Sequence, residues 1–150
     1  MKVKRLIYFI PLAFVSCMQN EKITLEYINA PVDLIVTSMD ASTYELSFYS
    51  DNREGNFSGY GVFVGVSAAA VNTDTDSLPI DTSAATAFCA TSSQIIYASR
   101  VKIRVGATSG SDTLCNLTAL SLSSGQFVGL RARVEREEKA WSHAAIARAP

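Results

Sequence analysis

Hydrophobic and polar residues alternate with a period of two over most of the chain after residue 30. This periodicity places successive side chains on opposite faces of a β-strand. The alternating segments are 32–37, 44–49, 60–65, 94–97, 100–105 and 128–134, and a last strand is expected at Trp141–Ala147. Each segment therefore offers one apolar face that a second sheet can cover.

Clusters of turn-forming residues separate these segments, at 50–56, 106–112 and 123–125. Residues 73–93 are rich in Thr, Asp, Ser and Ala and lack a strand pattern, so they are expected to form a long loop or insertion. No long amphipathic helix is indicated. Many short strands with frequent turns predict an all-β protein, a single antiparallel β-sandwich over residues 30–150.

Three aromatic side chains on the inward sets, Tyr44, Phe48 and Tyr60, are expected in the core. Another three, Tyr49, Phe57 and Phe63, fall on opposite faces or in a loop. If these are exposed, they are candidate anchors for a partner. Phe63 packing under the 73–93 segment is the alternative.

The first 17 residues follow a different pattern. Basic residues are followed by the apolar run Leu6–Val15, which is too short to span a bilayer and contains Pro11. Ser16 and Cys17 close the run. This arrangement resembles a bacterial lipoprotein signal peptide.

The resemblance implies a signal peptide at 1–16, lipidation of the Cys17 thiol and a tether over 17–29. It also implies a cell-envelope location, and Met18 in place of the family's retention signal makes the outer membrane the default. Phe14 departs from the leucine that the family favours. An ordinary cleaved signal or an uncleaved anchor, with Cys17 incidental, stays open as an alternative.

Removal of residues 1–16 would leave 134 residues (150 − 16), enough for one domain. The mature part would carry 14 acidic residues against 10 Lys and Arg (13 − 3), a net charge of −4 (10 − 14). A mildly acidic domain does not indicate a nucleic-acid partner.

With Cys17 assigned to lipid, Cys89 and Cys115 are left as a pair in an oxidising compartment. A disulfide between them would close a loop of about 27 residues. Two buried free thiols are the alternative, because free cysteine behaves as a small apolar core residue.

Several short motifs resemble a fibronectin type III domain, an immunoglobulin-like β-sandwich. The motifs are Ala30-Pro31, Tyr44-x-Leu46-x-Phe48, Gly59-Tyr60-x-Val62, Leu120 followed by Gly125, Val128-x-Leu130-Arg131-Ala132, and Trp141-Ser142. Two positions depart from the family. Phe48 stands where the family has tryptophan, and Gln126 stands where it has a corner tyrosine, so that corner hydrogen bond is lost or differently made.

Catalytic and metal-binding patterns are weak in this sequence. His143 is the single histidine, no Gly-x-Ser-x-Gly elbow is present, and too few ligands exist for zinc. Asp74, Asp76 and Asp81 offer oxygens to calcium, but without EF-hand spacing a solvated acidic loop is preferred. The sequence therefore predicts a protein that is not an enzyme and holds no cofactor or metal.

Five basic residues form the candidate surface for an anionic partner: Arg100, Lys102, Arg104, Arg131 and Arg133. They make one positive patch only if their strands face the same side. The alternative is an ordinary polar outer face, since Lys and Arg stems cover sheets well.

The expected function is a lipid-anchored, non-catalytic binding or structural module. Its partners would be the membrane, through acyl chains on Cys17, and an envelope protein, an extracellular protein or a polymer. Two alternatives stay open. One is a small hydrolytic enzyme on a β scaffold, and the other is an assembly or chaperone-like subunit that offers the Trp141–Ala147 strand edge for pairing.

Overall fold

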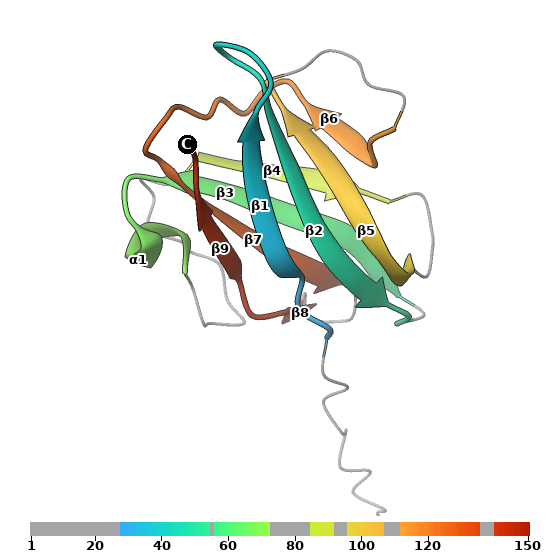
Figure 1. Ribbon diagram of the computed structural model, residues 1–150. Coiled ribbons are helices and arrows are strands. Elements are labelled where there is room, and N and C mark those ends of the chain that lie inside the picture. The colour runs from blue at the N-terminus through green and yellow to red at the C-terminus, as the bar shows by residue number, and fades with distance from the viewer. Residues whose placement is uncertain (1–27, 55, 73–84, 92–95, 107–111, 136–139) are drawn as a thin grey trace, which may run out of the picture.

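Two β-sheets packed face to face make up the described part of the protein (Figure 1). The structure, a computed structural model, describes residues 28–150 apart from residue 55 and segments 73–84, 92–95, 107–111 and 136–139. The first sheet has the order β1 (Val32–Ser38), β2 (Tyr44–Asn52), β5 (Ile96–Val105), β6 (Cys115–Leu117). The second contains β4 (Ala85–Ala90), β3 (Phe57–Gly65), β7 (Phe127–Val134), β8 (Ala140–Trp141) and β9 (Ala145–Arg148).

Both β8 and β9 pair with β7, so each sheet is four strands wide. A four-residue helix, α1 (Ala68–Val71), follows β3. Within the described ranges, no helix is long and apolar enough to cross a membrane. The predicted all-β sandwich is confirmed.

Three details differ from the sequence-based expectations. The sheets are not wholly antiparallel, because β5 and β6 pair in parallel. Part of the expected 73–93 loop is β4, a strand of weak formers that pairing with β3 holds in place. The expected last strand is interrupted between β8 and β9, where Ser142 continues the pairing through its backbone N–H, 2.9 Å from Ala132 O.

The predicted signal peptide, Cys17 and all but the last two residues of the predicted tether lie outside the described residues. Their assignments stay predictions. The described chain begins at Ile28, which packs against the core.

The core lies between the sheets, on the inward positions that the alternation predicts. Tyr44, Phe48 and Tyr60 are buried as expected, and the Phe48 and Tyr60 rings meet edge to face at 4.9 Å between centroids. Phe57, expected to be a candidate anchor, is also buried here. The largest fully buried apolar residues of this core are Tyr60, Phe48, Leu46, Ile103, Leu130, Val62, Val105 and Val128.

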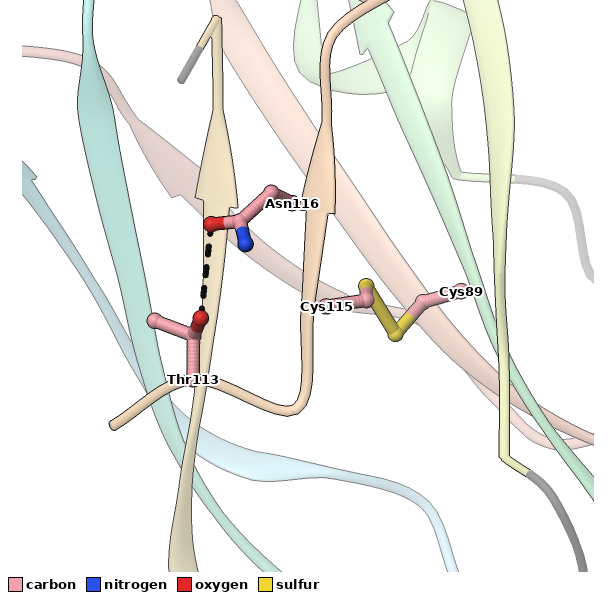
Figure 2. Close-up of a disulfide and its surroundings, with 4 residues drawn as sticks. All are labelled: Cys89, Thr113, Cys115 and Asn116. Carbon is pink, nitrogen blue, oxygen red and sulfur yellow. Dashed lines mark hydrogen bonds between the residues drawn. A yellow bond between two sulfur atoms is a disulfide. The ribbon is translucent and has the colours of Figure 1, made fainter. Parts of the chain in front are cut away.

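A disulfide joins the two sheets at one side of the sandwich (Figure 2). Cys89 lies on β4, an edge of the second sheet, and Cys115 lies on β6, an edge of the first. Their Cα atoms are 5.9 Å apart, within the range of protein disulfides. The predicted pairing is confirmed, and the free-thiol alternative is wrong. At the other side of the sandwich β1 lies against β9.

A glutamine side chain closes the turn before β7. Gln126 Oε1 accepts a hydrogen bond from the Ser123 N–H at 2.8 Å, and the preceding Gly125 has a φ of +83°, which glycine adopts without strain. Leu120, just upstream, is buried in the core. A side-chain amide oxygen therefore accepts a hydrogen bond within this turn.

A buried polar network fixes the chain where it enters the sandwich. The Tyr60 hydroxyl lies 2.7 Å from Ser50 Oγ and 3.0 Å from Asn52 Oδ1. Asn52 Nδ2 donates to Asn29 O at 2.9 Å, and the Asn29 N–H donates to Glu54 Oε1 at 2.9 Å. Burial raises the pKa of Tyr60 to about 12, so its hydroxyl stays protonated at neutral pH. Residue 29 is thereby held beside the end of β2.

Candidate functional site

The five predicted basic residues divide into two groups on different sheets. Arg100, Lys102 and Arg104 lie on β5 in the first sheet, whereas Arg131 and Arg133 lie on β7 in the second. Alternation along β5 and β7 with the buried core residues puts all five on the outer faces of their sheets. The two sheets pack face to face, so these outer faces lie on opposite sides of the sandwich (Figure 1). The structure therefore does not bring the five residues together as one patch.

On the first sheet, carboxylates accompany the basic row. Lys102 Nζ lies 3.1 Å from Glu45 Oε1 and 3.5 Å from Asp112 Oδ2. An Arg104 guanidinium nitrogen lies 3.3 Å from Glu45 Oε2 and 3.0 Å from Asp112 Oδ1. Two cations and two carboxylates thus form a balanced cluster. Arg100 is exposed, with a long contact of 3.4 Å to Ser47 Oγ.

In this ionic cluster the pKa of Lys102 is raised and that of Asp112 is lowered. The Glu45 carboxylate, by hydrogen bond and charge, raises the pKa of Lys102. A backbone hydrogen bond and the nearby Arg104 and Lys102 lower the pKa of Asp112. Solvent screens both groups, so the cluster neutralises the surface more than it stabilises the fold.

On the second sheet, the two arginines lie against aromatic rings. Arg131 is only 2 % exposed, its Nε donates to Ser142 O at 2.6 Å, and its guanidinium is 5.8 Å from the Trp141 ring. The Arg133 guanidinium lies 4.7 Å from the Phe88 ring and 5.5 Å from the Trp141 ring. It also forms an ion pair with Glu135.

Phe63, Phe88, Arg131, Arg133 and Trp141 are referred to together as the aromatic–arginine cluster. Trp141 is central: its ring centroid is 5.9 Å from that of Phe63 and 6.3 Å from that of Phe88. Glycine beneath it makes this possible, because a Cβ at Gly61 would come 2.5 Å from Trp141 Cζ3. Glycine within a strand marks such close approaches.

Part of the aromatic–arginine cluster is open to a partner. Phe88 is 36 % exposed on the edge strand β4, and Arg133 Nε is buried without an acceptor among the described residues. Tryptophan and arginine are the residues that most often carry binding energy at interfaces. Cation–π contacts of this kind hold the arginines in fixed positions.

Sequence reasoning missed Phe88, because residues 73–93 were expected to be a loop. Phe63, named as a candidate anchor, is buried beneath Trp141 and Val71. Phe63 is also directly opposite Thr86 of β4. Residues 73–84 lie outside the described residues, so packing of Phe63 under them stays a prediction. The signal that could have revealed the site is the pair of glycines at 61 and 65 within a strand, since they leave room for large neighbours.

Candidate catalytic and metal-binding residues are few elsewhere in the described part of the chain. His143 is exposed in the break between β8 and β9. No group of three or more His, Cys, Asp or Glu residues placed to hold a metal occurs among the residues that the structure describes. Asp74, Asp76 and Asp81, considered above for calcium, lie outside those residues.

The fold and the surface define a small disulfide-bonded β-sandwich protein. Comparisons of the chain with protein-family models, curated proteins and solved structures find no match.

Proposed function

We propose that the chain is an exported, lipid-anchored envelope protein whose β-sandwich is a non-catalytic binding module. The observation that carries export is the disulfide between Cys89 and Cys115. Disulfides form and persist in oxidising compartments outside the cytosol. With these two cysteines bonded to each other, Cys17 is the odd cysteine, which supports its assignment to lipid.

We further propose that the sandwich is of the fibronectin type III-like kind. The strand order supports this, because strands one, two and five share one sheet and strands three and seven share the other, as in immunoglobulin-like sandwiches. β4 pairs with β3. In the constant-type immunoglobulin order the fourth strand instead lies in the sheet of the fifth, so this pairing is a difference from that type. The glycine turn at Gly125 adds a local likeness, whereas Gln126 remains a departure from the family's corner tyrosine.

The aromatic–arginine cluster is proposed as the recognition surface of the module. It supplies a fixed ring at Trp141, an exposed ring at Phe88 and an incompletely bonded guanidinium at Arg133. A partner that offers a carboxylate or carbonyl beside an apolar side chain would match these groups. An envelope protein, an extracellular protein or a polymer can present such groups.

Two experiments test the proposal. Intact-mass analysis of the protein from cell envelopes is expected to find loss of residues 1–16 and acyl chains on Cys17; an unmodified Cys17 would contradict the anchor. Crosslinking in intact envelopes is expected to capture a partner that Phe88→Ser loses and that Val66→Ser, an exposed control, retains. Capture unchanged by Phe88→Ser would show that recognition occurs elsewhere.

Strand addition at β4 is a second candidate function, with an assembly role. β4 is an edge strand of six uncharged residues, and within the described chain it pairs with β3 alone. Natural edge strands usually carry charges or proline that prevent pairing. If β4 accepts a partner strand, Thr86→Lys should weaken that partner's binding and Phe88→Ser should weaken it less.

The non-catalytic part of the proposal is tested separately. His143 is the one histidine of the chain, so any histidine-dependent hydrolysis must use it. Turnover of general hydrolase substrates that His143→Ala abolishes would replace the binding module with the enzyme alternative.

A further inference from the structure

Exposed apolar side chains gather on the outer face of the first sheet. Six large apolar residues are exposed among the described residues, and three of them lie here: Val32 at 49 %, Ile35 at 52 % and Tyr49 at 39 %. Val32 is directly opposite Tyr49 across β1 and β2, and Ile35 is opposite Ser47. Arg100 follows as the neighbour of Tyr49 on β5. Val32, Ile35, Tyr49 and Arg100 are referred to as the tether-side patch.

A bulge in β1 creates this arrangement. Residues three apart on a regular strand point to opposite faces, yet Val32 and Ile35 both face outward. The pairing register shifts between them, and Asp33 has a φ of +53°, a left-handed conformation that non-glycine residues rarely adopt. Strained backbone of this kind clusters at functional sites. The strand is thus bent to expose two apolar side chains that a regular β1 would separate.

The tether-side patch lies at the end of the sheet where the chain enters. β1 begins at Val32, and β2 ends nearby (Figure 1). Asn29 is fixed at this end, because its Nδ2 donates to Asp51 O at 2.6 Å and its N–H donates to Glu54. Asn29 follows Cys17 by twelve residues, which span at most about 40 Å when fully extended. An acyl group on Cys17 would therefore keep the tether-side patch close to the bilayer.

The chemistry of the tether-side patch suits a bilayer surface. Tyrosine combines an apolar ring with a polar hydroxyl and is enriched at membrane interfaces. Arg100, exposed beside it, can contact a lipid phosphate, while the nearby Arg53 and Asp51 pair with each other at 2.7 Å. Three of the four side chains of the tether-side patch are uncharged, so the contact depends chiefly on apolar insertion.

Such a contact would be weak in an untethered protein. A short covalent link between two contacts raises the effective concentration of the second contact to about the millimolar range, where a few side chains suffice. The same reasoning favours the membrane over a soluble partner, because only the membrane is held at this concentration by the anchor.

We propose that the tether-side patch rests on the surface of the bilayer that holds the lipid anchor. The inference depends on the anchoring proposed above. It deepens that proposal, since it orients the domain: the first sheet faces the membrane, and the aromatic–arginine cluster faces away from it.

Fluorescence quenching by brominated lipids tests this orientation in the full acylated protein. Vesicles contain phosphatidylethanolamine and phosphatidylglycerol, and the wild-type signal comes from Trp141, the chain's one tryptophan. The tryptophan introduced by Tyr49→Trp is expected to be quenched several-fold more strongly than Trp141. The tryptophan introduced by Met39→Trp, exposed just beyond the opposite end of β1, is the matched control and should resist quenching.

Further variants separate the two proposals. Val32→Ser with Ile35→Ser in the Tyr49→Trp background should reduce the quenching towards that of Met39→Trp, and vesicle co-sedimentation should stay complete. Co-sedimentation without preferential quenching of the Tyr49→Trp protein would overturn the orientation and leave the anchor intact. Failure of the acylated protein to sediment with vesicles, or an unmodified Cys17, would overturn the anchor itself.

Discussion

The two outer faces of the sandwich carry similar basic rows in different surroundings. On β5, Lys102 and Arg104 stay partly in water and pair with carboxylates. On β7, Arg131 and Arg133 lie against aromatic rings, and Arg131 is buried. Alternation therefore predicts which face a side chain occupies, whereas the neighbouring strands decide what covers it.

The cross-strand neighbours explain the difference. Glu45 on β2 is directly opposite Arg104, so the cation meets a charge. Gly61 on β3 is directly opposite Arg131, and its missing side chain leaves space that the Trp141 ring fills. A charged neighbour keeps one face solvated, and a glycine neighbour lets the other become a second small core.

Removal of the Trp141 ring should destabilise the second sheet's outer face more than any other change considered for either face. Trp141→Ala is expected to lower the free energy of unfolding by about 3–5 kcal/mol, the usual cost of emptying a packed aromatic site. Tyr49→Ala, on the first sheet, should change it by less than about 0.5 kcal/mol, because the ring is exposed. Urea unfolding followed by far-UV circular dichroism measures both. Equal losses would show that the aromatic–arginine cluster is no better packed than the opposite face.

Loss of the disulfide should affect the fold as a whole and neither face in particular. Cys89→Ala with Cys115→Ala frees a loop of about 27 residues and should cost about 3–4 kcal/mol on the chain-entropy account. Because the bond joins strand edges and touches neither arginine row, the further loss caused by Trp141→Ala should add to it. Marked non-additivity in urea unfolding would mean that the disulfide also holds the second sheet's outer face.

The sequence predicted the core well, because period-two alternation is a direct consequence of strand geometry. Tyr44, Phe48 and Tyr60 are buried where expected, and Cys89 and Cys115 form the expected disulfide. The pattern also predicts that the basic residues avoid the core. It contains no information on which strands become neighbours, so the division of those residues between two sheets was not predictable.

Weak local sequence signals explain why the other features, β4 and the bulge in β1, were not predicted. β4 has few good strand formers, and its place depends on pairing with β3, which is a tertiary effect. Phe88 was missed for this reason. The bulge at Asp33 is likewise invisible in the alternation, since a regular strand would put Val32 and Ile35 on opposite faces.

Matched arginine substitutions on the two sheets should change the free energy of unfolding by smaller and unequal amounts. Arg131→Met removes the donor to Ser142 O and leaves a buried carbonyl without its partner, at a cost of about 1–3 kcal/mol. Arg100→Met should change the free energy of unfolding by less than about 0.5 kcal/mol, because Arg100 is exposed. Urea unfolding of the two single variants measures the contrast. A larger loss for Arg100→Met than for Arg131→Met would show that the basic residues on β5 contribute to stability more than those on β7.

The smallest expected effect is a pH dependence specific to the first sheet. The pKa of Asp112 lies below its usual 3.8 because a backbone hydrogen bond and Arg104 favour the carboxylate. Its contribution to stability is therefore complete above the unfolded value and is lost as the pH falls through the lower folded value. The stability difference between the wild type and Asp112→Asn should be constant near neutral pH and vanish in acid.

Asp40 does not disturb this measurement, although hydrogen bonds from the Ser42 and Thr43 region lower its pKa as well. It titrates in both proteins, so its effect cancels in the difference. Salt should shrink the difference, because the contacts of Asp112 are exposed and screened. The difference in free energy of unfolding between Arg131→Met and the wild type should not shrink with salt, because Arg131 is buried and donates to a neutral carbonyl. If the Asp112 effect did not depend on salt, the ion pairs of the first sheet would be as shielded from solvent as the buried hydrogen bond of Arg131. The proposed difference between the two outer faces would then be wrong.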